Sequence, residues 1–148
     1  QSMPVETLEA LNEQGAALPQ TTHLHWLENH MRRESIRSKW ADFFEDYDAI
    51  IMPISPVPPF PHNQEGNFGT RILQGSDGKE RPYSDLIRWT ILTGMAYLPS
   101  TTPPLGLDSD GLPVSFQVVG PYGGDYTTIR LAQFIGSENG GYKRPPLS

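Results

Sequence analysis

The side chains that most often carry chemistry are sparse in this chain. It has four histidines and no cysteine, so disulfides, thiolate catalysis and Cys-based zinc sites are excluded. His23, His25 and His30 are two and five residues apart, and on a helix such spacings do not converge on one face. His62 stands alone in a proline-rich stretch, which is typical of a surface residue. We therefore expect no metal site.

The hydroxyl groups lack the sequence context of a nucleophile. No G-x-S-x-G is present. Ser100, Thr101 and Thr102 lie near a predicted strand end with no His or Lys beside them, so they are expected to bond local backbone. A base brought near by the fold is the alternative. The glycine-rich stretch 120–125 precedes a predicted helix but has no Lys at the Walker position, so we expect no anion site there.

The carboxylates do not form an obvious catalytic pair. Asp108 and Asp110 belong to a predicted turn, and Asp48 leads a predicted strand. Asp85 falls in the first turn of a predicted helix, where a carboxylate favours the positive end of the helix dipole. A capping role is the simplest interpretation of that position.

Length and charge exclude several classes of protein. A chain of 148 residues is long enough for one domain with one core, and a net charge of −6 argues against a nucleic-acid-binding surface. No apolar run approaches the about 20 residues of a membrane span, and we expect a cytoplasmic protein. The first residues lack the features of a signal peptide, so we interpret them as a start within a longer protein or a processed end. The basic cluster is interleaved with acids, as in a solvated helix face; it comprises Arg32, Arg33, Arg37 and Lys39, with Glu28, Glu34, Asp42 and Glu45.

Helical spacing dominates the first third of the chain. Residues 5–17 predict a short amphipathic helix, and Thr21 or Thr22 can cap a longer one that runs to about Glu45. Seven turns is long for a small globule and indicates a helix lying across a larger body. One apolar stripe of this helix is expected to be buried; it comprises Leu24, Trp26, Leu27, Met31, Ile36, Trp40, Phe43 and Phe44.

Strand patterns follow. Residues 48–54 form a continuous apolar run, which predicts a strand buried on both faces. Residues 55–81 predict a long irregular loop, and loops of this length are usually functional or mobile. A helix over 83–95 is expected, with Ser84 as its N-cap and four residues facing inward: Leu86, Ile87, Ile91 and Leu92.

The last third predicts strands at 100–105 and 114–119 around a turn at 108–113, then a helix over 126–137. Asp125 would cap that helix, with Ile129, Leu131, Ala132 and Ile135 facing inward. The whole order indicates an α/β arrangement with three strands. Because three strands with one fully apolar member cannot cover themselves, we expect the chain to form the end of a larger sheet.

Four segments together resemble the C-terminal part of the amidase signature family: RRESIRSKWADFFEDYDAIIMPISPVPPF (32–60), LPSTTPPLG (98–106), GLPVSFQVVGPYGGD (111–125) and IRLAQFIGSENGGYKRPP (129–146). The resemblance covers about residues 20 to 146. It implies an α/β/α fold around a mixed sheet. Residues 1–148 would then be one C-terminal segment of a single amidase domain, with a long helix and buried strand (19–54), a loop (55–81), and a helix, two strands and a helix (82–148).

The resemblance also implies hydrolysis of carboxamides through a Ser–Ser–Lys triad. The Lys and the Gly/Ser-rich segment of that triad, typically GGSSGG, belong to an earlier part of the family's sequence and are not found here. Lys39, Lys79 and Lys143 do not occupy the catalytic context. We therefore expect no catalytic residue, metal or cofactor in this chain, and no activity from the chain alone.

The resemblance implies that this segment shapes the substrate pocket. Ile54 ends the predicted strand, where ligand sites of α/β sheets gather, and Asp85 and Trp89 lie on the next helix. These three residues are the expected substrate-binding positions. In the branch of the family that acts on glutamine, a comparable helix carries an Asp that holds the substrate amine. The Leu98–Pro99 pair, without a preceding Asn, is more like the broad bacterial and fungal amidases.

The implied partners are the N-terminal part of the same enzyme, a small, largely apolar or aromatic amide, and a second copy in a homodimer of the intact protein. A third hypothesis is a clipped enzyme whose two pieces remain associated. The competing hypothesis from another class is a stand-alone, non-catalytic binding or scaffold domain that uses loop 55–81. It predicts that the chain folds alone as a monomer. The amidase hypothesis instead predicts exposed apolar faces at Met31, Trp40 or Ile50 unless the other part is present.

Overall fold

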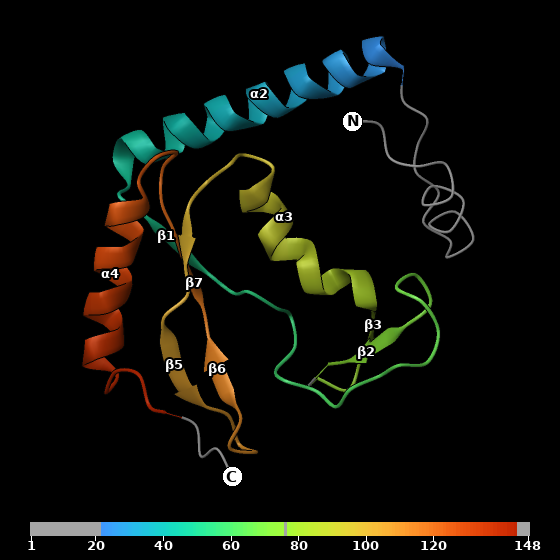
Figure 1. Cartoon of the computed structure of the whole chain (residues 1–148), viewed down its shortest axis with the longest axis vertical. Helices are drawn as coiled ribbons and strands as arrows, with labels where there is room; N and C mark the ends of the chain where they lie inside the picture. Colours follow the sequence, from blue (N-terminus) through green and yellow to red (C-terminus); the bar gives the residue numbers. More distant parts are fainter. Residues whose placement is uncertain (1–21, 76, 145–148) are drawn as a thin grey trace.

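The computed structural model describes residues 22–75 and 77–144, so the helix expected over 5–17 lies outside the described residues. Groups of short strands lie between the helices along the chain (Figure 1). In chain order they are α2 (His23–Asp46), β1 (Ile50–Met52), β2 (Ile72–Gln74), β3 (Glu80–Pro82), the 3₁₀ helix η1 (Tyr83–Ile87), α3 (Arg88–Gly94), β4 (Ser100–Thr101), β5 (Pro104–Leu107), β6 (Pro113–Ser115), β7 (Gln117–Val119) and α4 (Asp125–Glu138).

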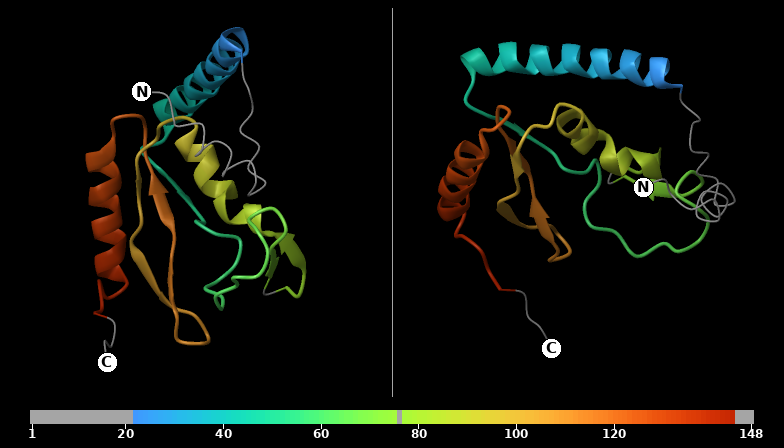
Figure 2. Two further views of the ribbon diagram at one scale, coloured as in Figure 1. Left: turned by 45° about the vertical axis from the view of Figure 1, so that its right-hand side comes forward. Right: turned by 45° about the horizontal axis from the view of Figure 1, so that its top comes forward.

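Helix α2 begins where its cap predicts. The Thr22 hydroxyl accepts a hydrogen bond from the backbone N–H of His25 at 3.2 Å, and the helix ends one residue beyond the expected Glu45. The expected burial of its apolar stripe is wrong within this chain, because none of its residues is buried and Met31 is 71% exposed. The physical reason is visible in Figure 2, where α2 crosses one edge of the molecule and only one side of it faces the other elements.

A three-stranded antiparallel sheet with the order β1-β7-β4 forms the centre. Val119 of β7 lies opposite Ile50 on one side and Ser100 on the other. The prediction that the first strand is buried on both faces is wrong here: Met52 is buried, whereas Ile51 is 55% exposed. Alternate residues of a strand face opposite sides of the sheet, and among the described residues only the Met52 side is covered.

Strands β4 to β7 form one long interrupted hairpin. β4 pairs with β7 inside the sheet, while β5 and β6 pair beyond it and carry the expected turn at their tip (Figure 1). The Asp108 N–H donates to the Leu112 carbonyl at 2.8 Å, and the Asp108 carboxylate accepts from the Leu112 N–H at 2.8 Å. Thr102 and Pro103 lie between β4 and β5, and Pro104 is the first residue of β5; neither proline has an N–H to continue the ladder.

Residues 55–81 are not a loop throughout. They contain β2 and the start of β3, which form a small antiparallel hairpin with Gln74 opposite Glu80. The Gly75 N–H donates to the Lys79 carbonyl at 2.9 Å and closes the turn. A strand of only three residues between glycines and polar residues is too short for its two-residue periodicity to be recognised in the sequence.

The helix expected over 83–95 is divided into η1 and α3. Ser84 does not cap it, since Pro82 precedes η1 and Ile87 precedes α3 without a side-chain cap. Of the four residues expected inside, Ile87, Ile91 and Leu92 are exposed and Leu86 is half-buried. Buried Thr93 and Ala96 instead mark the side that faces the molecule.

Helix α4 packs against β4 and β7. Its N-cap is Gly124, and Asp125 is the first helical residue without a capping hydrogen bond, so the expected cap is wrong by one position. Inward positions are Thr128, Ala132 and Gly136, whereas Ile129 is 46% exposed. The small core that results centres on Val118, Val119 and Thr128, each below 2% exposure. None of the described helices is long and apolar enough to cross a membrane.

Candidate functional site

A groove of about 290 Å³ opens where β1 ends, and we call it the β1 groove. One wall is the segment that leaves β1; it contributes Ile54, Ser55, Val57, Pro58, Pro59 and Phe60. The opposite wall comes from η1 and β6 and consists of Leu86, Pro113, Val114 and Ser115. The lining is almost wholly apolar, and its polar side chains are two serines. Such a concave apolar site with few polar groups is the usual form of a small-molecule site.

A buried glutamine fixes the floor of this region. Gln117 is 2% exposed, and its side-chain amide donates to the Pro53 carbonyl at 2.8 Å. Its side-chain oxygen accepts from the Ser100 hydroxyl at 3.1 Å. One side chain of β7 therefore ties the end of β1 to the start of β4. The Pro53 carbonyl directly precedes Ile54, so Gln117 sets where the first wall of the β1 groove begins.

Aromatic side chains hold the segment after β1 against η1. Phe60 meets the Tyr83 ring edge-on at 6.3 Å between centroids, and Phe68 meets the same ring at 5.7 Å. Residues three apart eclipse each other in a 3₁₀ helix, so Tyr83 and Leu86 share one side of η1. Phe60 thus belongs both to the groove wall and to this aromatic cluster.

The three substrate-binding positions predicted from the sequence are placed differently. Ile54 is half-buried and lines the β1 groove. Asp85 lies in the first turn of η1, next to Leu86, but its carboxylate accepts a hydrogen bond from Arg88 Nη2 at 2.8 Å and is 13% exposed. Trp89 is half-buried on α3. Neither Asp85 nor Trp89 is part of the groove lining.

Several hydroxyls near the sheet are engaged with one another or with the backbone. Thr128 donates to the Asp125 carbonyl at 2.8 Å, and its oxygen lies 2.9 Å from the Thr101 hydroxyl. Ser100 is paired with Gln117, as described above. The Ser55 hydroxyl accepts from the Val57 N–H at 3.2 Å. In residues 22–75 and 77–144 no group of three or more His, Asp or Glu side chains could hold a metal ion.

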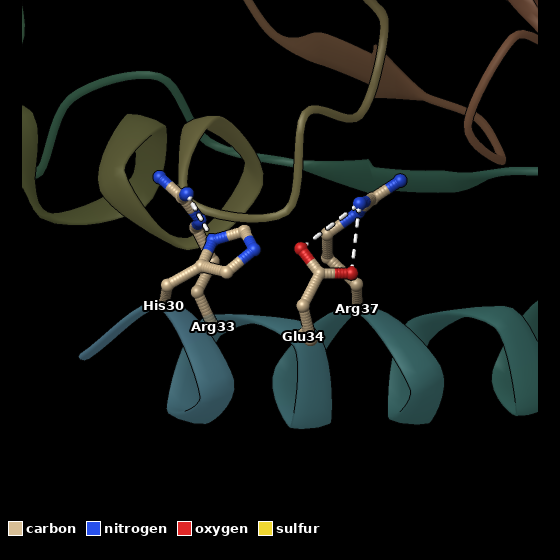
Figure 3. A network of polar contacts seen from close by, with 4 residues as sticks. All are labelled: His30, Arg33, Glu34 and Arg37. Atoms are coloured by element: carbon tan, nitrogen blue, oxygen red, sulfur yellow. Dashed lines mark hydrogen bonds and ion pairs between the residues drawn. The ribbon is translucent and has the colours of Figure 1, made fainter. Parts of the chain in front are cut away.

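A second feature joins α2 to the other elements. Figure 3 shows Arg33 and Arg37 extending from α2 toward the rest of the molecule. Arg33 Nη2 donates a hydrogen bond to Nδ1 of His30 at 2.7 Å. Arg37 binds both carboxylate oxygens of Glu34, at 3.0 and 2.9 Å. The solvated face expected for this charge cluster is therefore wrong for these two arginines.

Both guanidinium groups lie over aromatic rings. Arg33 and Arg37 are 5.0 and 5.3 Å from the centre of the Tyr97 ring, and Arg37 is 4.8 Å from that of Tyr122. Tyr97 has φ +57°, a left-handed conformation rare for a residue other than glycine. Its N–H donates to the Gly94 carbonyl and the Leu98 N–H donates to the Thr93 carbonyl, which is the Schellman ending of α3. We call the two arginines and two tyrosines the α2 bracket.

Sequence reasoning missed Gln117, Ser115 and Phe60. The signal for Gln117 was present: a lone amide between apolar residues of a predicted strand must find buried partners. Ser115 and Phe60 carry no such signal, because only the meeting of two distant segments makes them neighbours of one groove.

Comparison with known proteins gives a consistent set of matches. A family model described as amidase matches residues 5–129. A subunit of the glutamyl-tRNA(Gln) amidotransferase from an Exiguobacterium species is 32% identical over 115 residues, which is 78% of this chain and 22% of that protein. The protein of the same name from Salinibacter ruber is 34% identical over 105 residues, or 70% of this chain and 18% of the relative. This chain spans about a fifth of the length of these curated relatives.

Solved structures agree on the fold. A crystal structure described as that of an amidase aligns with a TM-score of 0.64 at 21% identity, over 88% of this chain and 31% of the other. The corresponding glutamyl-tRNA(Gln) amidotransferase subunit from Thermotoga maritima aligns with a TM-score of 0.60 at 25% identity, over 94% of this chain and 27% of the other. These matches confirm the α/β fold class.

Proposed function

Because this chain belongs to the amidase family, we propose that it is the C-terminal portion of an enzyme that hydrolyses a carboxamide to a carboxylate and an amine or ammonia. The observation that carries this proposal is the β1 groove, an apolar site at the end of a sheet strand in a chain of this family. The groove lies at the carboxyl end of β1, and in open α/β sheets ligands bind outside the carboxyl ends of strands. The chain would complete the sheet and shape the pocket.

The reacting groups would lie on a part of the enzyme outside this chain. A serine oxygen there forms a bond to the amide carbon, a second serine relays the proton, and a lysine acts as base. The carbon–nitrogen bond then breaks, the amine leaves with the relayed proton, and water releases the carboxylate from the serine. Backbone N–H groups stabilise the negative oxygen that forms during both steps.

The exposed apolar side chains support a partner of this kind. Met31 is 71%, Ile51 is 55% and Leu24 is 68% exposed, and all three are large aliphatic residues. Large apolar side chains left exposed on a helix and on a sheet strand are surface that another polypeptide could cover. We propose that the N-terminal part of the same enzyme covers it. A homodimer of the intact protein and a cytoplasmic location stay predictions from the sequence.

Ile54 would contact the substrate on this side, and Asp85 and Trp89, which lie outside the groove lining, stay predictions from the sequence. Support is strongest for Ile54, which lines the groove. Asp85 is next to Leu86 of the lining, and its carboxylate is paired with Arg88 at 2.8 Å. Trp89 follows one residue after that arginine.

A second candidate function rests on the names of the relatives. Two of them are named as subunits of a glutamyl-tRNA(Gln) amidotransferase. In that case the intact protein would work with further subunits, and the nitrogen released from the amide would pass to an acceptor instead of to water. The same nucleophile chemistry would serve both reactions.

Ammonia release from hexanamide, benzamide and L-glutamine tests the proposal. We expect the intact protein to release ammonia from at least one amide, and the separate 148-residue chain to release none. Hydrolysis by the 148-residue chain alone would contradict the proposal that the reacting groups lie outside it. Intact protein that needs an added acceptor for turnover would favour the amidotransferase candidate.

A further inference from the structure

The lining of the β1 groove indicates which kind of acyl group it can bind. Resting on the proposed amide hydrolysis, we infer that this groove binds an uncharged, apolar acyl group, so that the preferred substrates are neutral alkyl or aryl amides and not amino-acid amides. Three features of the described residues support this: the charge of the lining, its shape and its polar groups.

The lining carries no ionised side chain among the described residues. The nearest acidic residue in sequence, Asp85, is not part of the lining, and its carboxylate is paired with the Arg88 guanidinium at 2.8 Å. The two charges offset each other. An ammonium or carboxylate entering the groove would lose hydration without gaining a counter-charge, which is costly.

The shape suits a short chain or one ring. An apolar cavity of about 150 Å³ is enough for benzene, and the β1 groove measures about 290 Å³. Phe60 presents an aromatic wall that the edge-on contact with Tyr83 holds in place. Leu86, on the same side of η1 as Tyr83, adds an aliphatic side chain to the lining.

The polar groups of the lining are few and uncharged. The Ser55 hydroxyl already accepts a hydrogen bond from the Val57 N–H. Ser115 lies on β6 with its residue exposed, so it reaches both the groove and solvent. This makes Ser115 a position where a charge can be introduced without burying it in the core.

The experiment compares two charge-carrying variants of Ser115 in the intact protein. Ser115→Asp and Ser115→Lys place opposite charges at one edge of the groove. Ser109→Asp and Ser109→Lys are the matched controls, because Ser109 is exposed in the turn of the same hairpin and does not line the groove. Kinetics are measured with hexanamide, benzamide and L-glutamine, and binding of benzamide is followed separately by saturation-transfer NMR.

For wild-type protein we expect kcat/KM for hexanamide or benzamide to exceed that for L-glutamine by at least about ten-fold. Both Ser115 variants should raise KM for the neutral amides by about ten-fold, with either sign of charge, because each charge perturbs an apolar site. The Ser109 variants should stay within about two-fold of wild type. Equal or better use of L-glutamine, or a KM insensitive to both Ser115 charges, would overturn the inference.

Failure of the proposed function gives a different result. If no amide is hydrolysed but benzamide binds and both Ser115 variants weaken it, the groove assignment stands and the hydrolase proposal falls. If amides are hydrolysed but both Ser115 variants bind benzamide as well as wild type does, the hydrolase proposal stands and the groove assignment is refuted. Absence of both hydrolysis and binding refutes both.

Discussion

Replacing Gln117 with leucine removes two hydrogen bonds while nearly conserving volume. The amide of Gln117 donates to the Pro53 carbonyl at 2.8 Å and accepts from Ser100 at 3.1 Å, at a site only 2% exposed. A neutral buried hydrogen bond contributes about 1 kcal/mol, so the pair amounts to about 2 kcal/mol of the free energy of unfolding. The Pro53 carbonyl, which directly precedes Ile54, loses its hydrogen bond from Gln117. The groove wall that begins at Ile54 should therefore become less well ordered.

Denaturant unfolding of the intact protein measures the stability change, and steady-state kinetics measure its effect on the groove. We expect Gln117→Leu to lower the free energy of unfolding by about 2 kcal/mol. KM for the preferred amide should rise while kcat stays within about two-fold, because the reacting groups are elsewhere. A purely structural role for Gln117 would lower stability and leave KM unchanged.

Gln74→Leu is the matched control. Gln74 also makes a side-chain hydrogen bond, to Glu80 at 3.1 Å, but on an exposed hairpin, so the same substitution should cost less than about 0.5 kcal/mol. A double-mutant cycle of Gln117→Leu with Ser100→Ala should show coupling of about 0.5–1.5 kcal/mol, since the two side chains share a bond. Equal stability of the Gln117 and Gln74 variants would refute the reasoning.

Two further predictions concern the frame around the groove. A Cβ at Gly120 would lie 2.7 Å from Thr128 Cγ2, so Gly120→Ala should destabilise the intact protein by about 1–3 kcal/mol in a thermal unfolding assay. Gly94→Ala meets nothing within 4 Å and should be neutral or slightly stabilising, and equal melting temperatures for the two variants would contradict the packing argument. Arg37→Met removes the contacts of Arg37 with both tyrosines of the α2 bracket and leaves Arg33 over Tyr97. Amide exchange in α2 should accelerate by a few-fold, in line with about 0.5–1 kcal/mol for an exposed cation–π contact. The exposed Arg32→Met is its control, and equal exchange in both variants would show that the bracket does not hold α2.

Features with a local cause were predictable from the sequence. The Thr22 cap, the extent of α2 and the Asp108 turn each depend on neighbouring residues, and the structure confirms all three. The family was recognisable because four separated segments kept their order and spacing, a pattern stronger than any one motif. Helix and strand types follow from the same short-range periodicity.

The errors in predicting which apolar residues are buried share one cause. Ile51, Met31 and Ile91 were expected inside, yet each is more than 40% exposed in this chain. Apolar periodicity shows that a face is meant to be covered, but it does not show which polypeptide covers it. Tyr97 is a further case, because its left-handed conformation and its place beneath two arginines are decided by the end of α3 meeting α2.

By itself the sequence determined the long helix α2, the strands β1 and β7, the last helix α4, the family, and the absence of cysteine chemistry. Only the tertiary structure decided that Ile54, Leu86 and Ser115 line one groove, and that Gln117 ties the end of β1 to Ser100. Residues 54 and 115 are brought together because antiparallel pairing sets Met52 opposite Gln117. That pairing is a long-range contact, and its register depends on the burial of Val118 and Val119. Local sequence alone cannot specify such a register, because it does not show which distant strand pairs with β7.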